Sequence, residues 1–392
     1  MKQYLTYLKG DPVIWIITLL FLAISILSVY SFIPILVKTE GGSPFSYLSK
    51  HFIYILLGFL AMFWIHKQDP KYVSKLSKFA LYLSIGLLIF TFFFGVRVNE
   101  ASRWVRVPII GLTFQTSDLA RLTLLIYLSR TLVLKEQLLD NWKEGFLPLM
   151  LPIIIIVGLI AKDNFSTAAI LFLISVVLLF IGRVPISKLA ITIGSGLALL
   201  GIVILIHLAV PALNLLPRFD TWMSRFFKAY GENVEVVNNA QSINAELAIH
   251  NGGYFGVGVG NGKLKQYLPE AYADFYFASF VEEFGLFLAY GLIFLYLILF
   301  YRILRVGLNA SKMFETFVCI GIGLIILSQA SINMMVCTGL IPVTGQNMPF
   351  LAMGGSAMIM SCISLGIVQS IARKNNEPDN KVVKDPSSST IN

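Results

Sequence analysis

Ten stretches of the chain are apolar over about the length that crosses a lipid bilayer, and they limit what the chain can fold into. A spanning helix needs roughly 20 mostly apolar residues, and within lipid every backbone N–H and C=O must be paired inside the protein. Hydrophobic residues make up 57% of the sequence and charged residues only 13%, which excludes an ordinary soluble domain. We therefore predict an all-α, polytopic membrane protein with about ten transmembrane helices. The stretches are residues 13–36, 52–66, 79–95, 117–134, 147–161, 165–182, 189–210, 275–301, 314–338 and 356–372.

Basic residues predict which side of the membrane each connection faces. A net charge of +9 can indicate nucleic-acid binding, but cytoplasmic loops of membrane proteins also carry an excess of Lys and Arg. Eighteen of the thirty basic residues lie at the two termini and in alternate connections. We predict that both termini are cytoplasmic and that the odd-numbered connections face outward.

Three segments outside the apolar stretches are distinctive. Residues Val96–Gln115 mix Arg with Trp and apolar residues, which predicts a segment lying along the membrane interface. The extracytoplasmic loop between the seventh and eighth spans, about 211–274, is far longer than an ordinary connection. Its stretch from Trp222 to Tyr230 alternates aromatic and basic residues, which favours a partly helical, membrane-hugging excursion. We predict one transmembrane domain over 1–373 and a disordered cytoplasmic tail over 374–392.

The end of the long loop contains the acid that we rank first for chemistry. A glycine-rich segment from Gly252 to Gly262 can take tight turns or lie close to a ligand, and it leads to Asp274 just before the eighth apolar stretch. A boundary Asp is most often a helix cap. Glu282 follows within membrane, where acids are costly and usually functional. At 100° per residue, Asp274 and Glu282 lie within roughly 80° of each other on a helix.

Other polar groups stand at the same predicted side. Asp118 and Arg121 are three residues apart and can pair along one helix face, as a structural ion pair or as a substrate site. Arg103 and Arg106 are either snorkelling residues or guanidinium forks for phosphate. Asn164 or Ser166 is expected to cap a helix. The non-helical segment Gly339–Ser356 beside the membrane predicts a re-entrant or cavity-lining loop.

Cysteine and histidine residues do not predict a metal site. The cysteines fall within or at the ends of apolar stretches, where a thiol acts as a small packing group. The histidines are scattered and have no zinc-ligand spacing. These residues are Cys319, Cys337, Cys362, His51, His66, His207 and His250.

Five motifs, in matching order, resemble those of the SEDS family (shape, elongation, division, sporulation), the FtsW, RodA and SpoVE cell-wall polymerases. The segment Leu268–Phe275 (LPEAYADF) resembles the family's LPEAHTDF, and Glu282–Gly285 (EEFG) resembles EELG. The other matches are Pro342–Gly345 and Pro349–Ser356 with the single motif PVTG…PF.S.GGSS, Ser102–Trp104 with SRRW, and Gln115–Arg121 with QPSE.AK. The chain departs from the family at Tyr272 and Ala273 (His and Thr), Asn164 (an acid), Asp118 (Glu), Arg121 (Lys) and Ala357 (Ser).

The resemblance implies a peptidoglycan glycosyltransferase that polymerises lipid II in the bacterial cytoplasmic membrane. Asp274 is then the candidate base, since a positioned carboxylate can accelerate such a step about 10²–10⁴-fold. The departing lipid pyrophosphate needs cations, for which Arg103, Arg106, Arg121 and Lys263 or Lys265 are candidates, with a divalent Mg²⁺ or Mn²⁺ as a further option. Asp118, Glu282 and Ser356 complete the set of candidate substrate-binding residues.

The resemblance also implies partners and a cellular place. Glycine-rich GGYFGVGVGN followed by PEA favours the FtsW branch, and therefore cell division at the septum. A single-span class B penicillin-binding protein and other divisome membrane proteins are the expected partners. Two alternatives stay open: a lipid II transporter or flippase, against which no inverted repeat is visible, and a non-catalytic divisome scaffold.

Overall fold

The computed structural model describes residues 9–98, 101–106, 113–209, 240–268 and 270–377. Each of the ten predicted spans coincides with one helix, and eight of the described helices are long and apolar enough to cross a membrane. The helices are α1 (Pro12–Glu40), α2 (Pro44–His66), α3 (Pro70–Phe94), α4 (Thr116–Leu134), α5 (Leu147–Ala161), α6 (Phe165–Ile181), α7 (Ile186–Ala209), α9 (Ala240–Gly252), α10 (Tyr276–Leu308), α11 (Met313–Cys337) and α12 (Gly355–Asn375). The predicted polytopic helical fold is confirmed.

Capping explains one of the two largest boundary differences. The second span was expected at residue 52, but α2 begins at Pro44. Ser43 precedes it, and the Ser43 side chain accepts a hydrogen bond from the Ser46 N–H. Proline at the first helical position has no N–H to leave unpaired, so the polar residues after it can still form a helical turn.

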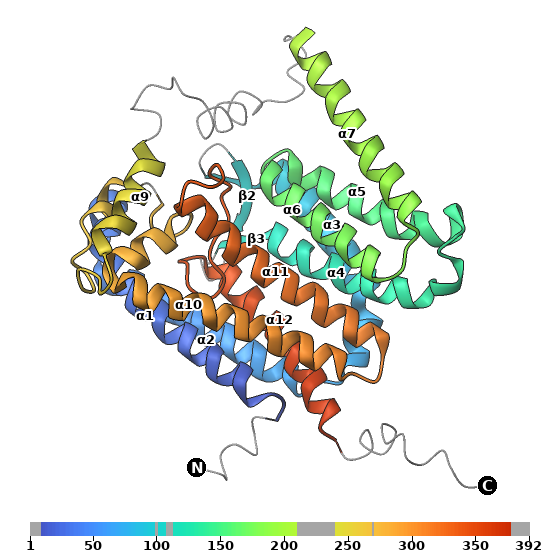
Figure 1. Ribbon diagram of the computed structural model, residues 1–392, viewed down its shortest axis with the longest axis horizontal. Helices are drawn as coiled ribbons and strands as arrows, with labels where there is room; N and C mark the ends of the chain where they lie inside the picture. The colour runs from blue at the N-terminus through green and yellow to red at the C-terminus, as the bar shows by residue number, and fades with distance from the viewer. Residues whose placement is uncertain (1–8, 99–100, 107–112, 210–239, 269, 378–392) are drawn as a thin grey trace.

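Two buried hydrophobic clusters build the bundle. One is formed mainly by α1, α2, α10, α11 and α12, and the other by α3, α4, α5 and α6 together with one side of α11. Figure 1 shows α11 running between these two groups and α7 projecting away from the bundle. Almost none of α7 is buried. The bundle therefore consists of two packed halves joined along α4 and α11, with α7 outside both.

The segment expected along the interface folds as a small sheet. Strands β1 (Val96–Val98), β2 (Ala101–Arg106) and β3 (Thr113–Gln115) form an antiparallel sheet in the order β1-β2-β3. Trp104 pairs with Gln115, and β3 leads directly into α4. This small sheet within the helical fold was not expected, because strands this short show no periodicity that a sequence would reveal.

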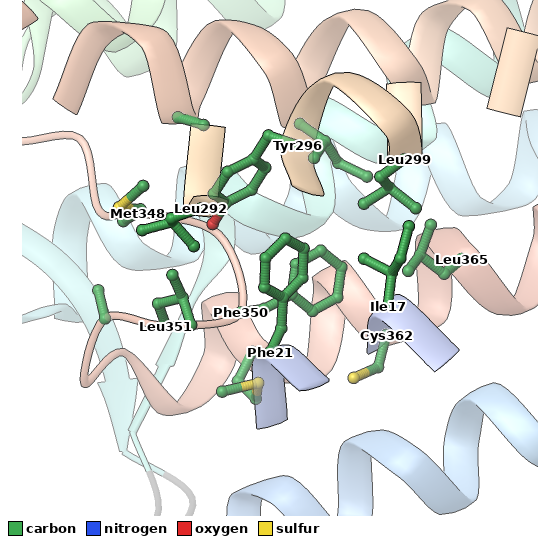
Figure 2. Packing of buried hydrophobic residues seen from close by; sticks show 14 of the residues in the cluster. Ile17, Phe21, Leu292, Tyr296, Leu299, Met348, Phe350, Leu351, Cys362 and Leu365 are labelled. Atoms are coloured by element: carbon green, nitrogen blue, oxygen red, sulfur yellow. The ribbon is translucent and has the colours of Figure 1, made fainter. Parts of the chain in front are cut away.

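The loop between α11 and α12 returns into the bundle, as predicted. Phe350 is 1% exposed and stacks on Phe21 of α1, with 5.7 Å between the ring centroids. Figure 2 shows this loop lying among side chains of α1, α10 and α12. Its carbonyl groups are paired: Tyr296 Oη donates to Pro349 O (2.5 Å) and Ser25 Oγ donates to Leu351 O (3.1 Å). Non-helical backbone is tolerated here because protein groups satisfy it.

The two described ends of the chain lie on the same side of the bundle. The Asp11 N–H donates to Gln369 Oε1 (2.7 Å), near the end of α12. An even number of spans requires this arrangement. The predicted interface excursion from Trp222 to Tyr230 lies outside the described residues, as does the expected disordered tail beyond residue 377. The helix α12 continues to Asn375, two residues beyond the predicted domain boundary.

Candidate active site

Asp274 lies where the long segment after α7 joins α10. The helix begins at Tyr276 and its N-cap position belongs to Phe275, so Asp274 stands one residue before the cap. Asp274 is partly buried, and its N–H donates to Glu270 O (3.1 Å). The N-cap alternative for Asp274 is therefore not supported by the helix boundary.

Asn333 of α11 fixes the backbone around Asp274. The Asn333 side chain is fully buried. Its Nδ2 donates to the carbonyl groups of Asp274 (3.0 Å), Ala273 (3.2 Å) and Gln346 (2.9 Å), while its Oδ1 accepts from the Phe277 N–H (3.3 Å). One amide therefore joins the residue before α10, the first turn of α10 and the re-entrant loop.

A second group of polar side chains continues from Gln346. Arg121 Nη1 donates to Gln346 Oε1 (3.2 Å), and Arg121 also forms an ion pair with Asp118. Ser356 Oγ donates to Asp118 Oδ2 (3.2 Å), and Gln346 Nε2 donates to Thr167 Oγ1 (2.5 Å). The predicted ion pair on α4 is confirmed. The network joins α4, α6, α11 and α12 through residues that are distant in sequence.

This network borders a small cavity. Its polar lining comes from Asp118, Arg121, Gln329, Asn347, Ser361 and Ser364. The guanidinium and the carboxylate in this lining are already paired with each other, so the cavity offers hydrogen-bonding groups with little net charge. The cavity has a volume of about 30 Å³, which is room for about one water molecule and not for a sugar ring.

The glycine-rich segment after α9 packs against α10. The N–H groups of Val257 and Gly258 donate to the carbonyl groups of Glu282 (2.9 Å) and Glu283 (3.0 Å). Gly256 has φ 78°, and a Cβ there would stand 2.2 Å from Glu283 O. Gly285 also has positive φ (78°) and interrupts the helical backbone of α10. These glycines therefore allow the loop and helix backbones to touch.

Glu282 holds the same segment. Its side chain is fully buried, and Oε1 accepts from Asn251 Nδ2 (3.1 Å), the Lys263 N–H (2.9 Å) and the Leu264 N–H (3.0 Å). A carboxylate that binds two backbone N–H groups and an amide stabilises a loop. A substrate contact of Glu282 would have to use its other carboxylate oxygen, Oε2, which is buried and has no hydrogen-bond partner among the described residues.

Lys265 forms a buried ion pair. Its side chain is 3% exposed and pairs with Glu283 of α10. Lys265 Nζ also donates to the carbonyl (2.9 Å) and hydroxyl groups of Ser31 on α1. An ammonium has three hydrogens, and these contacts use all of them. A role for Lys265 in binding pyrophosphate would require breaking this pair.

The remaining candidates are placed by their elements. Arg103 and Arg106 belong to β2, next to the strand that leads into α4, and their side chains lie outside the described residues. Asn164 caps α6, as expected, because its side chain accepts from the Thr167 N–H (3.1 Å). Among the described residues, no three His, Cys, Asp or Glu side chains gather in a way that could hold a metal ion.

Sequence reasoning missed Asn333 and recorded Gln346 only as part of a motif. Asn333 lies in an apolar stretch, and a lone amide in a membrane span is a recognisable signal because its polar atoms need partners there. Gln346 lies in the re-entrant loop, and its partners Thr167 and Arg121 are far away in the sequence. No local pattern indicates that pairing.

Comparisons with known proteins agree over almost the whole chain. The family model for FtsW, RodA and SpoVE, described as cell cycle protein, matches residues 11–377. A probable peptidoglycan glycosyltransferase FtsW from Geobacter sp. (strain M18) is 31% identical over 373 residues, which cover 93% of this chain and 97% of the relative. A probable peptidoglycan glycosyltransferase FtsW from Coxiella burnetii is 32% identical, covering 92% and 96%.

Solved structures share the fold. One, described as showing structural coordination of polymerization and crosslinking by a peptidoglycan synthase complex, aligns with a TM-score of 0.72 at 21% identity, covering 94% of this chain and 99% of that one. The rod shape determining protein RodA of Thermus thermophilus aligns with a TM-score of 0.63 at 21% identity, covering 94% and 98%. By its full-length family match and its motifs, the chain belongs to the FtsW/RodA/SpoVE family of cell cycle proteins.

Proposed function

We propose that this multi-pass inner-membrane protein is a peptidoglycan glycosyltransferase that polymerises lipid II during cell division, with Asp274 as the general base. The names of its FtsW relatives support the class of enzyme. The observation on which the assignment of the base rests is the position of Asp274. It is an acid between the external loop and α10, and a buried amide fixes its backbone.

The reaction needs one proton acceptor and an anionic leaving group. A sugar hydroxyl oxygen of one substrate attacks the anomeric carbon of the other, and the bond from that carbon to the lipid pyrophosphate breaks. The hydroxyl proton passes to a carboxylate oxygen of Asp274, and the lipid pyrophosphate leaves with the bonding electrons. A single displacement of this kind inverts the configuration at the anomeric carbon. Holding both sugars in line with the carboxylate supplies much of the acceleration.

The contacts in the network divide the candidate residues by role. Arg121 is shared between Asp118 and Gln346, so it orients the polar lining of the cavity more readily than it neutralises pyrophosphate. Arg103 and Arg106 are the cations that we propose for the pyrophosphate. Their strand is joined to β3, which leads into α4 and its polar residues.

We further propose that a single-span class B penicillin-binding transpeptidase works with this chain. The support is the similarity in fold to a structure described in terms of polymerization and crosslinking by a peptidoglycan synthase complex. The proposal predicts that glycan polymerisation rises when the partner is added. Full polymerase activity of the isolated protein in detergent would contradict the dependence on a partner.

The decisive experiment compares Asp274 variants of the full chain, purified with the partner and supplied with labelled lipid II. Asp274→Asn keeps the size of the side chain but cannot accept the proton, so we expect polymerisation to be abolished with normal expression and partner binding. Asp274→Glu is also expected to be poor, because an added methylene displaces the carboxylate from hydrogen-bond reach.

Glu282→Gln is the matched control. The amide retains an acceptor oxygen for the loop N–H groups, so any loss should appear in thermal stability more than in rate. A polymerising Asp274→Asn enzyme would refute the assignment of the base and direct attention to Asp118 or Glu282.

A further inference from the structure

A second cavity lies at the end of the bundle opposite Asp274. It has a volume of about 450 Å³ and opens among the start of α1 and the ends of α10 and α12. This volume is in the range of small-molecule sites, about 300–1,000 Å³. The helix α10 separates the two regions: Arg302 in the cavity lining is 28 residues from Asp274, or roughly 40 Å at 1.5 Å per residue. This cavity is therefore too far from Asp274 to take part in the proposed polymerisation chemistry.

Reciprocal contacts hold its walls together. The Asp11 N–H donates to Gln369 Oε1 (2.7 Å), and Gln369 Nε2 donates back to Asp11 O (2.8 Å). Arg302 of α10 forms an ion pair with Asp11. The three helix ends are thus fixed to one another, and the cavity between them is preformed.

The lining carries more positive charge than its one carboxylate balances. Arg302 and Arg305 stand at i and i+3 of α10 and both line the cavity, whereas Asp11 is the only acid in the lining. Asp11 is already paired with Arg302 and also caps α1 by accepting from the Val13 and Ile14 N–H groups. A guanidinium charge therefore remains uncompensated at the cavity.

Hydrogen-bond donors in the cavity lining that have no acceptor indicate an anionic ligand. Arg302 Nε is buried and has no hydrogen-bond partner within the described chain. No ion pair or side-chain hydrogen bond of Arg305 is found among residues 9–377 where they are described. The hydroxyl group of Ser311 also lines the cavity. By contrast, the amides of Asn375 and Asn376 already donate to backbone carbonyl groups.

A snorkelling arginine at a membrane boundary is the simpler explanation for Arg305 alone. It does not explain the buried Nε of Arg302 or the open cavity between the helix ends. Arginine forks match the oxygen geometry of phosphate closely. We propose that this cavity binds a phosphate group, carried by an anionic membrane lipid or by a phosphate compound in solution.

Two measurements on the purified full chain separate the two sources. The first is the thermal midpoint in detergent with increasing sodium phosphate, compared with sodium chloride at equal ionic strength. The second is native mass spectrometry with dioleoylphosphatidylglycerol or dioleoylphosphatidylcholine. A rise of the midpoint with phosphate identifies a soluble ligand, and selective retention of the phosphatidylglycerol identifies a lipid headgroup.

Two variants change affinity in opposite directions. Arg305→Gln removes the exposed, uncompensated charge and should weaken binding by about tenfold, the typical effect of losing a charge-assisted hydrogen bond. Asp11→Asn retains a capping oxygen for α1 but releases Arg302, so it should tighten binding. Arg305 has no structural contact to lose, so the first variant is expected to fold normally.

Lys312→Gln is the matched control, because it removes one positive charge at the same end of the bundle outside the cavity lining. Binding of either phosphate probe that is lost in Arg305→Gln and kept in Lys312→Gln supports the proposal. The proposal is overturned if neither probe binds in preference to chloride or phosphatidylcholine, or if the two variants lose binding equally.

Discussion

Replacing Asn333 by alanine tests whether a buried amide positions the proposed base. In the wild-type protein, Nδ2 of this side chain contacts the carbonyl groups of Asp274, Ala273 and Gln346, and Oδ1 accepts from the Phe277 N–H. Asn333→Ala removes both functions. The junction between the external loop and α10 then loses its only side-chain bridge to the re-entrant loop among these contacts.

The expected loss of stability follows from the number of backbone groups left unpaired. Two hydrogens on Nδ2 satisfy two carbonyl groups at a time, so the variant leaves about two carbonyls and one N–H without a partner. Each buried unsatisfied group costs about 1–3 kcal/mol, giving a total of roughly 3–9 kcal/mol. Since Asn333 is fully buried, solvent can offset only part of this cost.

The assay measures the thermal midpoint and lipid II polymerisation of the same preparation, with rates taken well below the midpoint. We expect a clear drop of the midpoint and a fall in kcat that exceeds the change in KM, because a displacement of about 1 Å in a catalytic group can cost about 10²-fold. Ser328→Ala is the control: its hydroxyl donates only to Ile325 O of the same helix. A variant with wild-type midpoint and kcat would refute the positioning role of Asn333.

Three further predictions concern the loop, the sheet and the topology. Lys265→Met should lower the thermal midpoint strongly, because an unpaired Glu283 remains buried at a cost of about 3–5 kcal/mol. Adding Glu283→Leu should restore much of the loss. An unchanged midpoint in the single variant would argue against the ion pair. Arg103→Ala should reduce lipid II use more than expression or stability, whereas unchanged polymerisation kinetics would leave it as a snorkelling residue. An impermeant thiol reagent added outside cells should label Ala240→Cys and spare Asn380→Cys, and the opposite pattern would reverse the predicted orientation.

The helices could be predicted because the membrane makes their signal strong. Runs of apolar residues located all ten spans, including α4, whose first turn contains Thr116, Ser117 and Asp118. The kink at Gly285 could not be predicted in the same way. It depends on Gly256, whose N lies 2.4 Å from where a Cβ of Gly285 would stand, and that approach joins residues from two separate elements. The sequence around either glycine does not predict such a contact.

Contacts between residues close in sequence could be predicted at the site, but hydrogen bonds between distant segments could not. Asp118 and Arg121 pair as their spacing indicated, and Asn164 caps α6. Asn333 and Gln346 connect the polar side chains into a single network. Their side-chain amides bond to groups more than 10 residues away in the sequence. An amide has no charge pattern and no fixed spacing to its partner, so its role becomes visible only when the backbone is folded.

A sequence alone cannot distinguish catalytic from structural acids, as Asp274, Glu282 and Glu283 show. All three are costly near a membrane, so loss of function on mutation is expected at each. The contacts separate them: Glu282 binds loop N–H groups, and Glu283 binds Lys265 and Ser31. Asp274 alone stands outside the helix, partly exposed, with its backbone fixed. A fall in activity at Glu282 or Glu283 should therefore accompany a fall in stability, whereas at Asp274 the two should be uncoupled.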